Sequence, residues 1–180
     1  CGGGMPPTGA AGALAFFALS AFGRVPTMLN FTSGAAALTS ALRTAQVKRV
    51  ITARRLVDKA GLGDVITALS DFEFVYLEDV RSKLSLADKL AAVAGKLAPR
   101  LVAARIDPSK TAVILFTSGT EGEPKGVALS HKNLLTNVAQ VRARLAKYPD
   151  DVMFNPLPIF HCFGLTGGTI LPLVAGKKVI

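Results

Sequence analysis

The 180-residue sequence has few of the residues that build disulfide scaffolds and metal centres. It contains two cysteines, Cys1 and Cys162, and two histidines, which excludes a disulfide framework and a Cys/His zinc cluster. Long polar runs are also few, and with 7% aromatic residues this argues against wholesale disorder. Free cysteines suit a reducing compartment, and we expect a cytoplasmic protein.

Acidic residues are also scarce, since 12 Asp and Glu stand against 21 Lys and Arg, for a formal charge of +9. The densest basic stretch, Arg43–Lys59, contains no aromatic residue and overlaps no nucleic-acid motif, so we expect no nucleic-acid partner. It predicts a solvated surface that attracts acidic partners weakly. Anionic lipid head groups, at the inner face of a membrane, and an acidic carrier protein both fit that charge.

Long hydrophobic runs are missing as well. The longest, Ala10–Phe22, has 13 residues, whereas a membrane-spanning helix needs about 20. No basic segment precedes this run, which argues against a signal peptide. We therefore expect a buried helix at this position, and we attribute the positive mean hydropathy of +0.41 to a buried core.

The rest of the chain alternates short β-type runs with helical patterns. Strands are expected at residues 25–30, 48–52, 74–77, 111–116, 127–129, 152–155 and 177–180. Helices are expected at residues 10–22, 33–46, 56–60, 65–69, 84–97, 131–147 and 165–174. Ser33 and Ser130 are predicted N-caps. Such alternation predicts an α/β fold with mostly parallel sheets and helices on both faces.

One loop carries the strongest chemical signal. An apolar strand ending at Phe116 is followed by a polar, glycine-rich segment that ends at Gly126. Glycines let backbone N–H groups approach an anion closely, while hydroxyls and Lys125 add donors and positive charge. This combination predicts a polyphosphate site. The segment lacks the G-x-x-x-x-G-K-[ST] pattern of a P-loop, and an ordinary surface loop is the alternative.

The segment Thr117–Lys125 resembles the phosphate-binding signature of the AMP-forming acyl-activating enzymes, a family that includes acyl-CoA synthetases, luciferases and adenylation domains. Gly126–Leu134 and Leu157–Leu165 are similar to segments that follow the signature in that family. Within the family, the sequence looks most like the acyl-[acyl-carrier-protein] synthetase half of bifunctional 2-acylglycerophosphoethanolamine acyltransferases.

The resemblance implies an ATP- and Mg²⁺-dependent ligase. A fatty acid would be activated as an acyl-adenylate and passed to a thiol of acyl carrier protein or CoA. The implied phosphate-binding residues are Thr117, Ser118, Gly119, Thr120, Glu121, Gly122, Pro124 and Lys125. Glu121 has two interpretations, a contact to magnesium through the triphosphate and an exposed loop carboxylate. The implied acyl-pocket residues are Phe160, His161 and Gly164.

Several alternatives stay open around His161. It can line the acyl pocket, cap the helix that follows, or, least favoured, bind a metal. Phe160 and Phe163 fit either a pocket wall or plain core. A nucleophilic pair of Cys162 with His161 is disfavoured, because side chains adjacent in sequence rarely face each other.

Other family motifs do not occur in these residues: the Tyr-Gly-x-Thr-Glu-like segment, the Thr-Gly-Asp and the C-terminal lysine. An acyltransferase His-x4-Asp motif is absent too. We expect residues 1–180 to be part of one large N-terminal adenylation domain, truncated at both ends and without the catalytic-lysine domain, and to be inactive alone. The alternatives are a truncated nucleotide- or phosphate-binding module without catalysis, and a lipid-binding structural domain.

Overall fold

The computed structural model describes residues 2–4, 10–117, 123–145 and 152–180. The strands are β1 (Gly2–Gly4), β2 (Pro26–Met28), β3 (Arg49–Thr52), β4 (Glu73–Tyr76), β5 (Thr111–Thr117), β6 (Lys125–Ser130), β7 (Val152–Met153) and β8 (Lys178–Val179). The helices of the first half are α1 (Ala10–Ala21), a 3-10 turn η1 (Phe31–Ser33), α2 (Ala35–Thr44), α3 (Arg54–Lys59), α4 (Gly63–Ala68), α5 (Leu77–Ser82), α6 (Leu86–Leu97) and α7 (Pro99–Val102). Those of the second half are α8 (His131–Leu145), α9 (Cys162–Leu165), a π-helical turn η2 (Thr166–Ile170) and α10 (Leu171–Val174).

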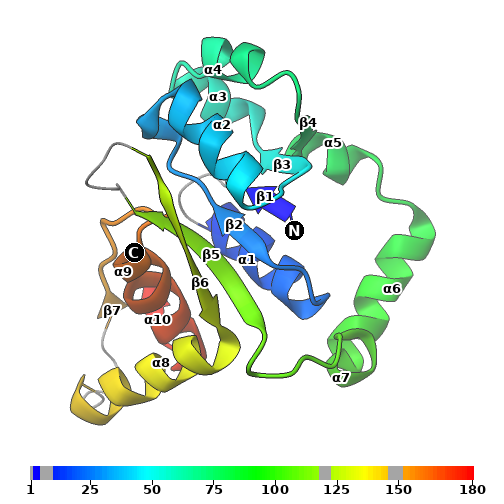
Figure 1. Ribbon diagram of the computed structural model, residues 1–180. Coiled ribbons are helices and arrows are strands. Elements are labelled where there is room, and N and C mark those ends of the chain that lie inside the picture. Colours follow the sequence, from blue (N-terminus) through cyan, green and yellow to red (C-terminus); the bar gives the residue numbers. More distant parts are fainter. Residues whose placement is uncertain (1, 5–9, 118–122, 146–151) are drawn as a thin grey trace.

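A six-stranded sheet in the order β4-β3-β1-β2-β5-β6 organises the described residues (Figure 1). Its first five strands are parallel, and β6 runs antiparallel to β5. The strands β7 and β8 form a second, parallel pair. The predicted α/β class with mostly parallel strands is confirmed. The central strand β1 was not foreseen, because its three glycines carry no side chains that could show a strand pattern.

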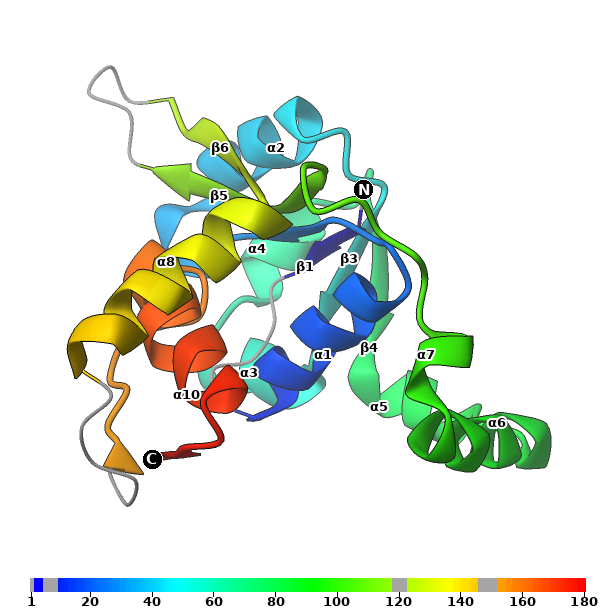
Figure 2. The same cartoon turned by 90° about the horizontal axis from the view of Figure 1, so that it is seen from below.

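Helices cover both faces of the sheet and bury two apolar clusters. On one face, α2 and α4 pack over Val50 and Ile114. On the other, α1, α8 and the α9–α10 run pack over Val113 and Leu115 (Figure 2). Neighbouring residues of β5 thus serve opposite clusters, as the pleat of a strand requires. This explains why β5 reads as one continuous apolar run.

Two sequence expectations were wrong in part. Ser33 does not cap α2, because it lies inside η1 and its hydroxyl donates to the carbonyl of Asn30 at 2.6 Å. The N-cap of α2 is Gly34, whose φ of +83° is a conformation that glycine adopts readily. The helix α1 is buried on one side only, where Phe16 is 4% exposed, while Leu14 on the other side is 71% exposed.

The predicted cap at Ser130 is confirmed. Its hydroxyl accepts from the backbone N–H of Asn133 at 3.0 Å, and the Asn133 side chain accepts from the backbone N–H of Ser130 at 2.9 Å. This reciprocal pair ends β6 and starts α8 within one residue. Among the described residues, no helix has both the length and the apolar character that crossing a membrane requires.

Candidate functional site

The end of the β5–β6 hairpin brings together two of the predicted phosphate-binding residues. In the antiparallel register Thr117 lies directly opposite Lys125, and both are exposed. A hydroxyl and an ammonium group therefore stand on neighbouring strands at the turn end of the hairpin. The predicted residues Ser118, Gly119, Thr120, Glu121 and Gly122 lie outside the described residues, and Pro124 is half-buried beside Lys125.

Phe116 and Gly126, the next pair of residues away from the turn, anchor this end of the hairpin. A Cβ at Gly126 would lie 3.2 Å from the Cε1 atom of Phe116, so the ring packs against the bare glycine backbone. The same ring packs on the apolar cluster beneath α2. Within the described part of the chain Lys125 has no carboxylate partner. Its charge is therefore available to an anionic ligand, on a strand that the core holds in place.

The predicted acyl-pocket residue Phe160 lies near this end of the sheet, in contact with Phe31. The rings of Phe31 and Phe160 form an edge-to-face pair with centroids 5.4 Å apart. Phe31 belongs to the cluster under α2 and Phe160 to the cluster on the opposite face, so the pair joins the two clusters. In the parallel register Met28, the last residue of β2, pairs with Leu115 near the end of β5. Asn30 and Phe31 therefore follow β2 at the edge of the sheet where β5 ends. The carboxyl edge of the sheet thus carries both the hairpin end and the aromatic pair.

His161 caps α9. Its Nδ1 atom accepts from the backbone N–H of Phe163 at 3.3 Å, and the imidazole is exposed. A neutral imidazole that accepts at Nδ1 carries its proton on Nε2, which leaves that atom free to donate. The capping interpretation is therefore realised in the structure. No group of three His, Cys, Asp or Glu side chains in the described ranges is arranged to hold a metal ion.

Gly164 is buried where no side chain fits. A Cβ at this position would overlap the carbonyl oxygen of Pro158. The carbonyl of Gly164 accepts from the hydroxyl of Thr169 at 2.8 Å and from the side-chain amide of Asn155 at 3.4 Å. Thr169 belongs to the π-helical turn that follows α9, and the Asn155 side chain lies against Gly168 of the same turn. Such π turns are frequent at functional sites.

Sequence reasoning missed Asn155 and Thr169. Asn155 also accepts from the backbone N–H of Leu157 at 3.2 Å, so one side chain fixes the segment before His161 and the helix after it. The available signal was Pro172, which has no N–H to donate to the carbonyl four residues earlier and so marks an irregular helix.

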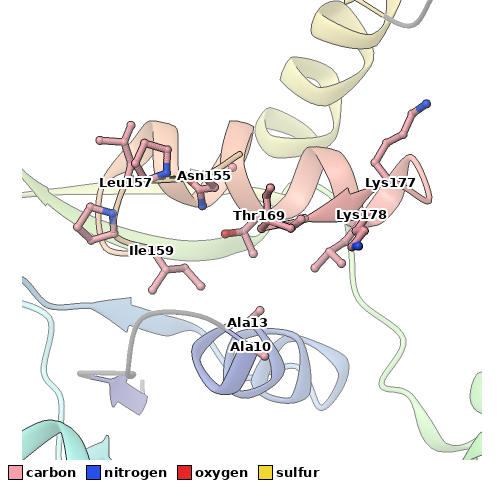
Figure 3. Close-up of a pocket in the computed structure, with 14 residues that line it drawn as sticks. Ala10, Ala13, Asn155, Leu157, Ile159, Thr169, Lys177 and Lys178 are labelled. Atoms are coloured by element: carbon pink, nitrogen blue, oxygen red, sulfur yellow. Dashed lines mark hydrogen bonds between the residues drawn. The ribbon is translucent and has the colours of Figure 1, made fainter. Parts of the chain in front are cut away.

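Two cavities flank the helical run α9–η2–α10. The larger, of about 720 Å³, lies between α1 and the last strand, and in Figure 3 Ala13 faces it from the α1 side. Its lining is Ala10, Ala13, Asn155, Pro156, Leu157, Pro158, Ile159, Gly168, Thr169, Leu173, Lys177, Lys178, Val179 and Ile180. The second, of about 630 Å³, is lined by Leu129, Asn133, Leu134, Asn137, Val141, Met153, Cys162, Phe163, Thr166, Gly167 and Leu171. Both volumes suit a small organic ligand.

The predicted acyl-pocket residues border these cavities without lining them. Ile159 faces the larger cavity, and Cys162 and Phe163 face the second. Phe160 and His161 lie between them along the chain, and Phe160 contributes to the apolar core. Phe163 is thus a cavity wall, with 65% of its surface exposed. The acyl-pocket assignment of Phe160, His161 and Gly164 stays a prediction.

Much of the charge on the basic stretch Arg43–Lys59 is paired. Ion pairs join Arg43 to Asp71 at 3.6 Å, Arg49 to Glu73 at 2.8 Å and Arg54 to Asp79 at 2.6 Å. The hydrogen bond from Arg49 to Glu73, with the charge of Glu73, raises the pKa of the arginine. The stretch is therefore a weaker attractor of acidic partners than its composition suggests.

Comparison with known proteins identifies the fold and the family of this chain. In fold it matches the crystal structure of ATP-bound MatB from Rhodopseudomonas palustris, with a TM-score of 0.73 and 24% identity, covering 99% of this chain and 34% of that one. The α/β fold is that of the N-terminal domain of adenylate-forming enzymes. Residues 5–180 match the AMP-binding enzyme family, and the chain belongs to that family.

Curated relatives are acyl-CoA ligases by name. The acyl-CoA ligase sidI of Beauveria bassiana (strain ARSEF 2860) is 31% identical over 174 residues, which cover 93% of this chain and 30% of the relative. The 4-coumarate–CoA ligase 1 of Petroselinum crispum is 30% identical over 170 residues, covering 92% and 30%. The chain thus spans about 30% of the length of these relatives.

Proposed function

We propose that the protein carrying this chain activates a fatty acid with ATP as an acyl-adenylate and transfers the acyl group to a thiol. In this proposal, residues 1–180 form part of one large N-terminal adenylation domain. The observation that carries the proposal is the pairing of Thr117 with Lys125 at the hairpin end of a chain that belongs to the AMP-binding enzyme family.

The first half-reaction gathers negative charge. A carboxylate oxygen attacks the α-phosphate of ATP, and pyrophosphate leaves as the acyl-adenylate forms. Lys125 and the Thr117 hydroxyl are suited to hold the β- and γ-phosphates, because charge-assisted donors placed in advance stabilise charge that develops in the transition state. Neither residue acts as a nucleophile, so positioning does most of the work.

Magnesium fits this arrangement through the nucleotide. Mg²⁺ usually binds substrate phosphates with one or two carboxylates and retained waters, so no cage of protein ligands is required. Of the loop's carboxylates, Glu123 is exposed beside Pro124, and Glu121 is proposed to contact the ion through the triphosphate. The ion would neutralise the phosphate oxygens, while Thr117 and Lys125 position the chain of phosphates.

The acid is proposed to be aliphatic. Most of the residues around the second cavity are apolar, and Phe163 forms one wall of it. Phe160, His161 and Gly164 are proposed to shape the entrance to the acyl site, with the Nε2 proton of His161 free to contact the carboxylate. The acceptor thiol is proposed to belong to acyl carrier protein or CoA, in the cytoplasm, with a peripheral contact at the inner membrane face.

The test is the substitution Lys125→Ala in the protein at its natural length. We expect fatty-acid-dependent exchange of pyrophosphate into ATP to fall by about 100-fold, the usual effect of removing one transition-state donor. The melting temperature should not change, because Lys125 is exposed. Lys132→Ala is the matched control, since Lys132 is exposed near the other end of the same hairpin.

If the Lys125→Ala protein exchanged pyrophosphate into ATP at an unchanged rate, the assignment of Lys125 as a phosphate-binding residue would fail. ATP binding without exchange for any acid offered would favour the alternative, a nucleotide-binding module without catalysis. We also propose that residues 1–180 alone do not release pyrophosphate, because the family's ribose-binding Thr-Gly-Asp and late lysine do not occur among them.

A further inference from the structure

The segment α6–α7 stands away from the body of the molecule. In Figures 1 and 2 it extends as an arm beyond the edge of the sheet that carries β4. Every residue of α6 except Gly95 is exposed, and Gly95 is covered by Val102 of α7. The arm returns to the body at Ala104, whose backbone N–H donates to the carbonyl of Ala21 at 2.8 Å. The two helices thus form a projection that is tied to the end of α1 at its C-terminal side.

One face of the arm is apolar and uncovered. We call it the arm stripe, and its members are Leu86, Leu90, Val93 and Leu97 of α6 and Leu101 of α7, which are 73%, 63%, 58%, 82% and 86% exposed. The four residues of α6 are spaced four, three and four apart, which places them on one side of a helix. A contiguous apolar stripe of this kind marks an interaction surface, because single exposed leucines are common but aligned ones are not.

The charges in the segment that carries the stripe are mostly positive. Between residues 81 and 105 one acidic residue, Asp88, stands against six basic ones: Arg81, Lys83, Lys89, Lys96, Arg100 and Arg105. All six are exposed, and within the described residues none of them forms an ion pair. The arm therefore differs from the basic stretch Arg43–Lys59, where three arginines are paired.

The charged residues of α6 occupy defined positions relative to the stripe. At roughly 100° per residue, Lys89 and Lys96 fall along one border of the stripe, and Asp88 falls on the opposite side of the helix. Asp88 is also engaged at the helix start, where it accepts from the backbone N–H of Ser85 at 2.8 Å and from the Ser85 hydroxyl at 2.6 Å. Lysines at the border of an apolar face can keep their ammonium groups in water while their stems lie along the apolar surface.

We propose that the arm stripe docks on the surface of an anionic lipid bilayer. An interfacial helix lies in the plane of the membrane, with its apolar face among the upper acyl chains and its cations at the lipid phosphates. Charge complementarity favours this partner, since Lys89 and Lys96 border the stripe and all six exposed cations of residues 81–105 lack an ion pair among the described residues. The proposal gives the peripheral membrane contact of the proposed function a defined surface. It rests on that part of the proposed function alone and needs neither ATP nor an acid.

The test uses the protein at its natural length and vesicle flotation. The vesicles are pure phosphatidylcholine, or a mixture of phosphatidylcholine with about 30% phosphatidylglycerol, chosen to give a clearly anionic surface. We expect flotation with the anionic vesicles, little with the neutral ones, and a loss at high salt. The double substitution Leu90→Glu with Leu97→Glu should lower the partition coefficient by at least about tenfold, because charged groups replace apolar ones at the interface.

Matched variants separate the arm from the rest of the surface. Leu135→Glu on α8, where Leu135 is 54% exposed, should float as well as the unchanged protein. Lys89→Glu with Lys96→Glu should reduce flotation by about tenfold, whereas Lys48→Glu with Lys59→Glu alters net charge equally and should reduce it far less. Equal losses in the two charge-reversed proteins would overturn the proposal, because net charge rather than the arm would then govern binding.

Other occupants of the stripe have their own signatures. If the Leu90→Glu with Leu97→Glu protein melts at a much lower temperature, another segment of the protein covers the stripe and the proposal fails. If it changes from dimer to monomer in sedimentation, the occupant is a second copy. Absence of flotation for the unchanged protein also overturns the proposal. Flotation is read without nucleotide, so loss of pyrophosphate exchange and loss of vesicle binding are distinguishable.

Discussion

The helices α2 and α6 have a similar spacing of apolar residues but differ in what covers those residues. Both carry leucines at helical spacing, and both present one apolar face. In α2, Leu38 and Leu42 are 1% and 0% exposed beneath the helix, whereas in α6 Leu90 and Leu97 are 63% and 82% exposed. Periodicity therefore defines a face of a helix but does not say what covers it.

Chain connectivity accounts for the difference. The helix α2 lies in the short connection from β2 to β3, strands separated in the sheet only by β1, so the chain must return closely over the sheet. The helix α6 lies in the long connection from β4, at one edge, to β5, near the other. This longer path has room for a projection. The difference between covered and uncovered leucines can be measured directly.

The largest effect should come from truncating the covered face. Leu42→Ala should lower the free energy of unfolding by about 2–5 kcal/mol, because it leaves a cavity in the cluster that α2 and α4 bury. Leu97→Ala on the arm should change it by less than about 0.5 kcal/mol. Urea unfolding of both proteins at natural length measures the contrast. Equal destabilisation would show that α6 is as well packed as α2.

A smaller effect is expected from adding one methyl group. Gly164→Ala should destabilise the protein by about 1–3 kcal/mol, because the new Cβ overlaps the carbonyl oxygen of Pro158 and the surrounding backbone must shift. Gly95→Ala on the arm is the control. Its Cβ would meet only the Val102 side chain, at 3.7–3.9 Å, and alanine favours a helix interior by about 0.5–1 kcal/mol. Melting temperatures that change in the same direction for the Gly164→Ala and Gly95→Ala proteins would contradict this account.

Parts of the fold that depend on local pattern could be predicted from the sequence. The β5 strand is a continuous apolar run, and Ser130 followed by Asn133 is a readable helix start. The resemblance of Thr117–Lys125 to a family signature predicts a phosphate site at this loop, and that assignment stays a prediction. The structure adds the register that sets Thr117 opposite Lys125.

Features that depend on distant contacts could not be predicted. Val127–Leu129 is too short a pattern to show that β6 is antiparallel. The carbonyl of Gly164, just before the π-helical turn, accepts from Asn155, which lies nine residues earlier and gives no periodic signal. Ser33 is a good capping residue, but the turn stabilised by Asn30 displaced the helix start beyond it. For β6 and for Asn155 a contact outside the local window decided the outcome, whereas at Ser33 a competing local turn did.

The smallest effect concerns the start of the arm. The hydroxyl and backbone N–H of Ser85 donate to Asp88, and these bonds hold the pKa of the Asp88 carboxyl below its usual value of 3.8. Since the folded pKa is lowered, the cap's contribution is fully present above about pH 4 and is lost as the pH falls through the lowered pKa.

The measurement is the Cα chemical shifts of both helices from about pH 5 to about pH 2. In the first turn of α6 these shifts should move toward coil values as the pH falls. The shifts of α2 should not, because no acidic residue lies in its first turn. Ser85→Ala should produce part of this fraying at neutral pH, with about 1 kcal/mol of local helix stability lost. Parallel shifts in both helices would indicate global acid unfolding, and the two regions would then not be independent in stability.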